Sequence, residues 1–226
     1  MTRSYQAIPL AFDHFTESEM RVRSQQHLLL MQKRRSVRSF ASKPVPRDVV
    51  ENVILAAATA PSGAHQQPWT FVLISDPDTK AKLRAAAEEE ERQSYGARMS
   101  PEWLAALAPL GTDWHKPHLT DAPFVLVVFE QVYGLVACDE GPPRRVKHYY
   151  VQESVGIAVG FLIAALHQVG LATLTHTPSP MGFLRTLLGR PDNERPFVVM
   201  PIGYPAADAT VPDLERKSLA EILIDR

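Results

Sequence analysis

The spacing of apolar residues changes several times along the chain, and three stretches carry a helical repeat. Residues 46–57 place apolar side chains at i, i+3 and i+4, and the run ends at the Pro-Ser-Gly of residues 61–63. A capping box formed by Thr16 and Glu19 predicts the start of an earlier helix. Residues 80–95 combine alanines with charged side chains, and this composition predicts a third helix.

Strand-like runs lie between and after these helices. Trp69–Ile74 is rich in β-branched and aromatic residues, and the almost wholly apolar run of residues 123–129 is typical of a strand covered on both faces. Residues 171–177 and 197–202 predict two more strands, and residues 139–145 predict a loop rich in Gly, Pro and charge. The pattern indicates one α+β domain with a small mixed central sheet flanked by helices.

The longest apolar run, residues 155–166, is shorter than the ~20 residues that a membrane span needs. Gly156 and Gly160 interrupt it. A helix of this kind, apolar on all sides, is predicted to lie in a core or at an interface.

Composition narrows the class of protein. The chain has 226 residues, 45% of them hydrophobic, and a formal net charge of −1, so we expect a folded domain without the basic field that nucleic acid or a membrane surface attracts. Cys138 is the single cysteine, which excludes an intrachain disulfide and fits a reducing compartment. Residues 1–13 lack a signal-peptide pattern. A small-molecule partner is favoured.

The pentad Arg34, Arg35, Ser36, Val37 and Arg38 is the most informative motif. Guanidinium groups match phosphate oxygens, and each such charge-assisted bond contributes roughly 1.5–3 kcal/mol. The alternative is a solvated basic patch that closes a helix, since short basic runs are common.

Other chemistry finds little support in the sequence. No serine lies in a G-x-S-x-G elbow, and neither a G-x-G-x-x-G nor a Walker A motif is present. The histidines at positions 115, 118, 148 and 176 do not follow a metal-ligand spacing, so no metal is expected.

Several separated motifs together carry a family resemblance. They are the pentad, Thr59-Ala60-Pro61-Ser62-Gly63-Ala64-His65, Pro68-Trp69-Thr70-Phe71 and Pro212-Asp213-Leu214-Glu215-Arg216-Lys217. With them the chain resembles the FMN-dependent nitroreductase superfamily. Residues 88–91, Tyr95, Arg98, Met99, Trp103, Trp114 and Lys116 make it similar, within that superfamily, to the iodotyrosine deiodinase family.

The resemblance implies an organisation for the whole chain. Residues 1–226 would form a single nitroreductase-like, FMN-binding domain and an intertwined homodimer. The domain would carry an N-terminal arm (1–15), a substrate lid (about 88–118) and a C-terminal extension (about 205–226).

The resemblance also implies an FMN site. Arg34, Ser36 and Arg216 would hold the phosphate, with Arg35 and Val37 beside them, and Arg38 would face the N1/O2 edge of the flavin. Pro61 and Ser62, together with Thr175, His176 and Thr177, would line the ring. The Thr177 hydroxyl would point at N5 and act as the catalytic group, because a donor there permits successive one-electron transfers. Strand propensity alone would make Thr177 an ordinary strand residue.

A substrate clamp is implied as well. Lys116 and Tyr95 would take the carboxylate of a halotyrosine, Glu91 its ammonium group, and the backbone N–H of Ala64 its phenolate. Glu91 and Tyr95 are four residues apart and share a helix face. Without the resemblance, residues 88–91 would be a solvated helix face and Lys116 an exposed charge.

Three features depart from the family pattern. His176 stands where the animal deiodinases carry Thr, the loop at residues 139–145 is a few residues longer than theirs, and their membrane anchor is missing. Because the membrane anchor is missing, we expect a cytoplasmic protein. Its physiological substrate could then be a halophenol other than iodotyrosine.

The implied function is FMN-dependent reductive dehalogenation of 3-iodo-L-tyrosine and related halotyrosines through one-electron steps. The alternatives are a general FMN-dependent NAD(P)H nitroreductase or quinone reductase and, in another class, a non-catalytic flavin-binding module.

Overall fold

The computed structural model describes residues 5–138 and 141–226. These residues form two compact units, one ending at Arg34 and one comprising Arg35–Arg226. Each unit is described by itself.

The first unit contains one helix, α1 (Glu17–Lys33). The predicted capping box is confirmed: Glu19 N donates to Thr16 Oγ1 at 3.3 Å, and Thr16 N donates to Glu19 Oε2 at 2.8 Å. No residue of α1 is buried, and residues 5–15 have no regular secondary structure. The helix therefore starts where its cap predicts and buries no apolar face of its own.

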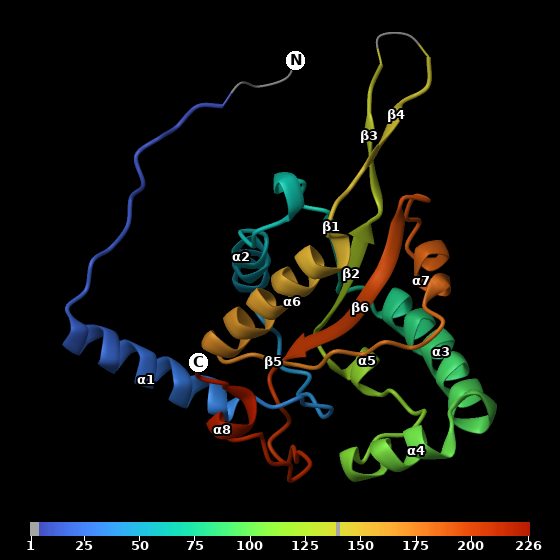
Figure 1. Ribbon diagram of the computed structural model, residues 1–226. Helices are drawn as coiled ribbons and strands as arrows, with labels where there is room; N and C mark the ends of the chain where they lie inside the picture. Colours follow the sequence, from blue (N-terminus) through green and yellow to red (C-terminus); the bar gives the residue numbers. More distant parts are fainter. Residues whose placement is uncertain (1–4, 139–140) are drawn as a thin grey trace. The chain divides into compact units, whose positions relative to one another are not determined.

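The second unit is built on a four-stranded sheet. The strands are β1 (Trp69–Ile74), β2 (Phe124–Gln131), β5 (Ala172–Thr173) and β6 (Glu194–Gly203), in the order β1-β2-β6-β5, and these three pairings are antiparallel (Figure 1). A parallel contact is added by the isolated bridge between Ser36 and Thr173.

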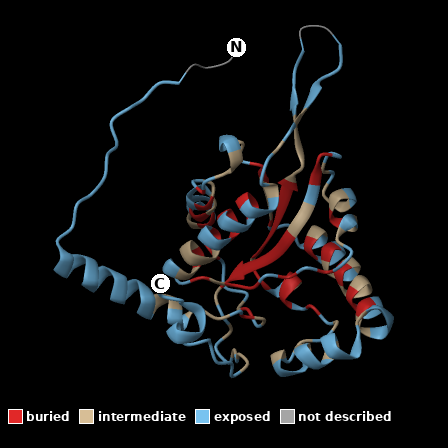
Figure 2. Ribbon diagram, viewed as in Figure 1, coloured by how far each residue is buried: buried red, intermediate tan, exposed pale blue. Residues whose placement is uncertain are grey.

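Helices cover both faces of this sheet, which explains why β2 is almost wholly apolar (Figure 2). Alternate residues of β2 point to opposite faces. Leu126 and Val128 pack with α2 (Arg47–Ala57) and α6 (Val151–Gln168), whereas Val125 and Val127 pack with α3 (Pro77–Gln93), α5 (His118–Asp121) and α7 (Gly182–Leu187). The predicted α+β arrangement is confirmed.

By length and composition, α6 is the one helix among the described residues that could cross a membrane. Helices in the cores of soluble proteins pass the same test, and α6 buries Val155, Leu162 and Leu166 against the sheet. Its other side exposes Ile157 and Phe161. The helix therefore has both a core face and an uncovered apolar face.

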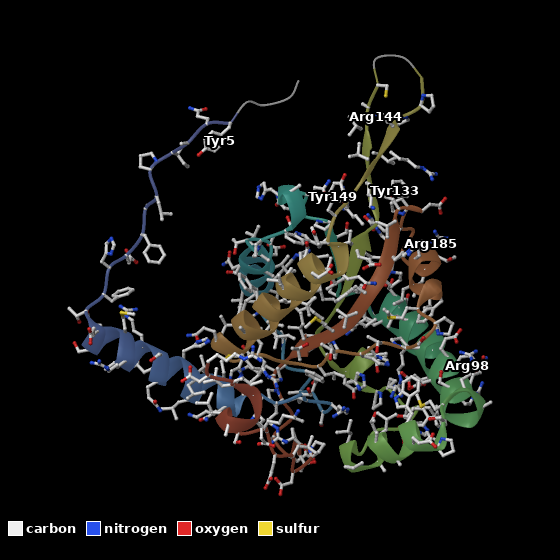
Figure 3. All side chains as sticks on the ribbon, in the orientation of Figure 1. Tyr5, Arg98, Tyr133, Arg144, Tyr149 and Arg185 are labelled. Atoms are coloured by element: carbon white, nitrogen blue, oxygen red, sulfur yellow. The ribbon has the colours of Figure 1, made fainter. Side chains whose placement is uncertain are left out.

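Two predictions of local structure were wrong in detail. The predicted strand at residues 171–177 is the two-residue β5, followed by a single bridge between His176 and Val199. The predicted loop at residues 139–145 overlaps a hairpin of β3 (Tyr133–Val136) and β4 (Arg144–Lys147), on which Figure 3 labels Tyr133 and Arg144. The guanidinium of Arg145 lies 4.7 Å from the centre of the Tyr133 ring. Cation–π contact and backbone pairing stabilise a charged segment as a strand there. Residues 139–140 lie outside the described residues.

Shorter elements complete the second unit. They are η1 (Gly63–His65), the π-helical turn η2 (Ser94–Arg98), α4 (Pro101–Leu107), η3 (Ala108–Leu110) and α8 (Leu219–Ile222).

Candidate active site

A cavity of about 210 Å³ opens between α3 and the segment that follows β5. It gathers seven of the residues that the sequence singles out: Arg38, Glu91, Tyr95, Lys116, Thr175, His176 and Thr177. Met99, Trp103, Leu107, Thr112, His118 and Leu174 complete its lining. Residues from four separate stretches of the chain therefore converge on one pocket.

The pentad reaches this pocket because it runs beside β5. Val37 N donates to Thr173 O at 3.2 Å, and the Val37 side chain is buried with Phe40 and Leu174. Since neighbouring side chains of an extended segment point to opposite sides, Arg38 faces away from this core and lines the cavity.

Residues 175–177 are held against β6. His176 N donates to Val199 O at 2.9 Å, and Val199 N donates to His176 O at 2.8 Å. The same alternation buries His176 and leaves Thr175 and Thr177 exposed. Two hydroxyl groups are thus displayed on a rigid backbone.

The centre of the pocket is a buried pair of opposite charges. Lys116 Nζ lies 3.6 Å from Glu91 Oε2, and the two side chains are only 5% and 10% exposed. Glu91 Oε1 is 2.9 Å from Nε2 of the buried His176. A charged residue is rarely buried unless it is paired, so this cluster is not the solvated helix face that charge runs usually form.

Lys116 is itself positioned by several acceptors. Its backbone N–H donates to Glu88 Oε1 at 2.8 Å, and its Nζ donates to Thr112 Oγ1 at 3.4 Å and to Asp113 O. Burial lowers the pKa of Lys116, and Glu91 opposes that shift. Burial would raise the pKa of Glu88, but the hydrogen bonds from Lys116 and Arg84 outweigh it and lower the pKa.

Tyr95 borders the same charges from η2. Its hydroxyl donates to Thr112 O at 3.2 Å, and its ring centroid lies 5.7 Å from Lys116 Nζ. Burial raises the pKa of Tyr95, so its hydroxyl keeps its proton at neutral pH and can donate.

His118 completes the cluster. Its ring packs edge-on against His176, with centroids 5.6 Å apart, and burial lowers the pKa of His118 to about 3, helped by His176 and Lys116. The sequence analysis did not place His118 here. Its position two residues after Lys116 was the only available signal.

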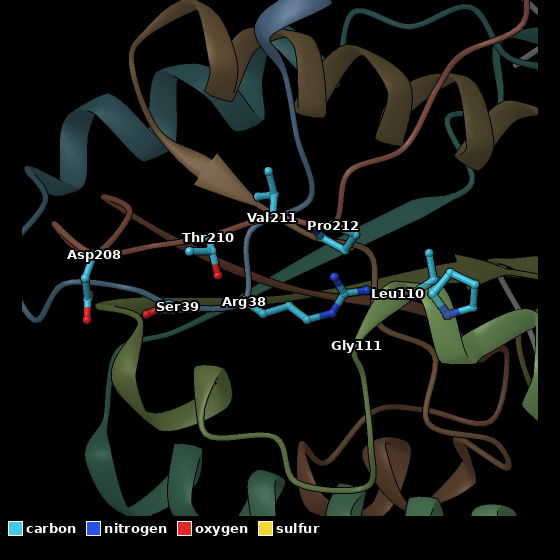
Figure 4. A pocket seen from close by; sticks show the side chains of 9 residues that line it. Arg38, Ser39, Leu110, Gly111, Asp208, Thr210, Val211 and Pro212 are labelled. Atoms are coloured by element: carbon cyan, nitrogen blue, oxygen red, sulfur yellow. The ribbon is translucent and has the colours of Figure 1, made fainter.

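A second cavity, of about 430 Å³, shares Arg38 with the first and is lined by residues 208–212 and by residues 109–111 at the end of η3 (Figure 4). Its other lining residues are Ser39, Pro109, Leu110, Gly111, Asp208, Thr210, Val211 and Pro212. Arg35 Nη2 donates to Pro212 O, which ties the pentad to the C-terminal segment. One cationic side chain, Arg38, therefore stands between two adjoining hollows.

Other predicted site residues lie outside the lining of the first cavity. Ser62 precedes η1, where its Oγ accepts from Gln67 N at 2.9 Å, and Ala64 has a left-handed backbone with φ of 51°. Gly63 is required there, because a Cβ would approach Tyr149 O to 2.4 Å. Among the described residues, Pro61, Ser62, Ala64 and Arg216 do not line the first cavity, and Arg34 belongs to the first unit.

The side of the pocket formed by α4 and η3 has weak packing. No residue of α4 or η3 is buried, and Trp103 is 52% exposed although it lines the cavity. Thr112, Leu107 and the buried Leu174 were not singled out from the sequence, because nothing local marks them as site residues.

Comparison with known proteins gives the chain its relatives. A family model described as the nitroreductase family matches residues 31–204. Iodotyrosine deiodinase from Haliscomenobacter hydrossis is 55% identical over 217 residues, covering 96% of each chain. Iodotyrosine deiodinase 1 from Mus musculus is 49% identical over 222 residues, covering 98% of this chain and 76% of the mouse protein.

Solved structures of the same family share this fold. A crystal structure of oxidised iodotyrosine deiodinase bound to FMN and 3-iodo-L-tyrosine superimposes with a TM-score of 0.73 at 30% identity, covering 88% of this chain and 97% of that one. A nitroreductase with bound FMN from Bacteroides fragilis has a TM-score of 0.64 at 19% identity, with 88% and 99% covered, and shares the fold. The predicted nitroreductase-like fold is confirmed.

Proposed function

The chain belongs to the nitroreductase family, and from this premise we propose that it is a flavin-dependent oxidoreductase that removes halogen from halotyrosines. The reaction converts 3-iodo-L-tyrosine to L-tyrosine and iodide. One observation carries the proposal: the buried pair of Glu91 and Lys116 lies in the same pocket as Arg38 and the hydroxyls of Thr175 and Thr177. The relatives that the chain resembles at 45–55% identity are iodotyrosine deiodinases.

The donor set of the pocket fits FMN. Arg38 supplies a fixed positive charge, and Thr175 and Thr177 supply exposed hydroxyl groups on backbone held by β6. Ser36 and Arg216 would bind the phosphate, with Arg35 and Val37 next to it, and Pro61, Ser62, Thr175, His176 and Thr177 would border the ring. When bound and reduced, FMN supplies the electrons for the reaction.

Arg38 contributes a positive charge to the lining of the cavity. Its positive charge would stabilise negative charge at the edge of a bound flavin ring. Thr177 is exposed and lines the cavity, and its hydroxyl would donate one hydrogen bond to a ring nitrogen. Thr177 is therefore our candidate for the catalytic group.

The clamp acts on the amino-acid end of the substrate. Lys116 and Tyr95 offer donors to a carboxylate, and Glu91 offers acceptors to an ammonium group. Their burial strengthens both interactions, because the local dielectric is lower than that of water. Because Ala64 does not line this cavity, its backbone N–H would receive the phenolate across the dimer boundary, next to the flavin.

The atom balance of the reaction is simple. Replacement of iodine by hydrogen takes up two electrons and one proton and releases iodide. The weakly packed segment of α4 and η3 forms the lid, which would exclude water from the pocket once the ligand binds.

The active form would be a cytoplasmic homodimer. Ile157 and Phe161 of α6 are 41% and 44% exposed, and Gly156 and Gly160 beside them face open space. Small and apolar residues on one stripe let a second helix approach closely and bury apolar area. Sedimentation at micromolar concentration is expected to give a dimer, and a flavin-bound monomer would contradict this assembly.

Iodide release tests the proposal. The FMN-loaded protein, reduced anaerobically with dithionite and mixed with 3-iodo-L-tyrosine, is expected to release iodide and tyrosine in equal amounts. A protein that leaves iodotyrosine intact while it oxidises NAD(P)H with nitroarenes is a general nitroreductase instead. FMN that is reducible but is not reoxidised by any aromatic acceptor would indicate a flavin-binding module.

A further inference from the structure

His176 contacts the carboxylate of Glu91, the same group that the proposed function assigns to binding the ammonium group of the substrate. Its Nε2 lies 2.9 Å from Glu91 Oε1, and the two side chains are 7% and 10% exposed. An ionised carboxylate only accepts hydrogen bonds, so Nε2 carries the hydrogen and donates it. The His176 backbone is held by its two hydrogen bonds to Val199.

The second oxygen of Glu91 is also occupied. Oε2 faces Lys116 Nζ at 3.6 Å. Before any ligand arrives, Oε1 therefore has a hydrogen-bond donor and Oε2 has a neighbouring cation. A buried carboxylate without donors is strongly destabilised, and a site of that kind requires a cation from its ligand. This pocket supplies its own donors.

His176 also has an unused nitrogen. Its Nδ1 is buried and has no hydrogen-bond partner among the described residues. Protonation at Nδ1 would turn the ring into a cation beside Glu91. Burial lowers the pKa of His176, and Glu91 opposes that shift. Lys116 and Arg38 act against protonation, as does the ring of His118 if it becomes charged, so the ring stays neutral at neutral pH until further negative charge enters the pocket.

We propose that His176 determines specificity by substituting for the ammonium group of the ligand, so that the pocket also accepts halogenated hydroxyphenyl carboxylates that lack an α-amino group. An example is 3-(3-iodo-4-hydroxyphenyl)propionate. The proposal rests on the proposed function, because it assumes that Lys116 meets the carboxylate of the ligand.

The charges in the pocket support this role. With a halotyrosine, the ammonium of the ligand joins His176 at Glu91, because a carboxylate has room for about four donors. The des-amino acid brings a carboxylate without an ammonium group, so the pocket gains one more negative charge than it does with a halotyrosine. A proton taken up at His176 Nδ1 neutralises it. Binding of the des-amino acid relative to halotyrosine therefore strengthens as the pH falls.

The test compares two ligands on the FMN-loaded protein. Dissociation constants for 3-iodo-L-tyrosine and for the iodohydroxyphenyl propionate are measured by flavin fluorescence from about pH 8 to about pH 5.5. The native protein is expected to bind the two within about tenfold of each other at neutral pH, and the ratio is expected to shift toward the des-amino ligand as the pH falls. Both ligands carry the same phenol, so its ionisation cancels in the ratio.

Two variants separate the roles of His176. In His176→Leu, discrimination against the des-amino ligand is expected to grow by more than about tenfold, since Glu91 loses a donor. His176→Gln keeps a donor but cannot take up a proton, so it is expected to retain most of the native ratio at neutral pH and to lose its pH dependence. His148→Leu is the control, because His148 bonds Gln131 O and does not line the cavity.

Three results would overturn the proposal. One is native discrimination of more than about a thousandfold, which would leave the proposed function intact. Another is a ratio in both His176 variants equal to the native ratio at every pH. The third is a native protein that binds neither ligand, which would contradict the proposed function as well.

Discussion

The two walls of the pocket are held in very different ways. The wall of residues 174–177 is bonded to β6 and backed by buried core, with His176 and Val199 exchanging two backbone hydrogen bonds. The opposite wall is made by η2, α4 and η3, and neither α4 nor η3 buries a single residue. Glu91 lies between them, near the end of α3, where Leu83 and Ala87 anchor the helix in the core.

The two walls differ in rigidity, and we infer that they serve different ligands. Thr175 and Thr177, which are proposed to face the flavin, come from the rigid wall, where the backbone is fixed before a ligand binds. Groups that surround the substrate come partly from a wall with few buried contacts, which can open and close at low cost in free energy. The predictions below separate the two walls by asking which changes affect binding and which affect stability.

The largest effect is expected from Glu91→Gln. Removal of one charge from a buried pair leaves Lys116 without its counter-ion, so halotyrosine affinity should fall by about 30-fold to 5,000-fold. FMN binding and nitroarene reduction should remain. Flavin fluorescence titration measures the affinity. Glu89→Gln is the matched control, because Glu89 pairs with Arg92 on the exposed face of the same helix. Equal losses in both variants would show that helix α3, rather than the buried charge, was affected.

A change behind the rigid wall should affect stability instead. Ile202 is fully buried and pairs with Thr173 of β5, so Ile202→Ala should lower the free energy of unfolding by about 2–5 kcal/mol. At a urea concentration where the variant is still folded, its halotyrosine affinity should change by less than about threefold. Urea denaturation of the FMN-loaded protein measures the first quantity. A stability equal to that of the native protein would contradict the packing described here.

Acid should destabilise the pocket through His118. Burial lowers the pKa of His118 to about 3 in the folded protein, against 6.5 for the free side chain. Between those values the unfolded chain binds more protons, so stability falls as the pH drops from 6.5 toward 3, by up to ~1.4 kcal/mol per pH unit. His118→Gln should reduce this slope in urea denaturation at several pH values. If the pH dependence of stability is the same in this variant as in the native protein, His118 is not held in its neutral form by burial.

The smallest effect is expected on the lid. Trp103 is 52% exposed and lines the cavity, so Trp103→Ala should lower halotyrosine affinity by about tenfold through lost apolar contact. The free energy of unfolding should change by less than about 0.5 kcal/mol. A large loss of stability would mean that the lid is part of the core and that the two walls are held alike.

Local signals predicted the elements that depend on local structure. The Thr16–Glu19 capping box and the strand Trp69–Ile74 were placed correctly, because a cap and a strand-rich run act within a few residues. The strand at residues 171–177 was too long in the prediction, and the β3–β4 hairpin was missed. Both depend on pairing with distant strands, which local composition does not report.

The site shows the same limit. Glu91, Tyr95 and Lys116 were singled out from the family resemblance, and the fold brings them into one cavity. The bond between His176 and Glu91 joins residues that are 85 positions apart, and no sequence pattern announces it. His118 and Thr112 were missed for the same reason, since only the packing of α5 and the lid brings them to the pocket.

Flavin fluorescence measured against 3-iodo-L-tyrosine and against plain L-tyrosine tests the central claim most directly. If the buried pair of Glu91 and Lys116 holds a halotyrosine over FMN, the iodinated ligand should quench the flavin at much lower concentrations than tyrosine does. A protein that binds FMN but shows no quenching by 3-iodo-L-tyrosine, or the same weak quenching by both ligands, would contradict the account.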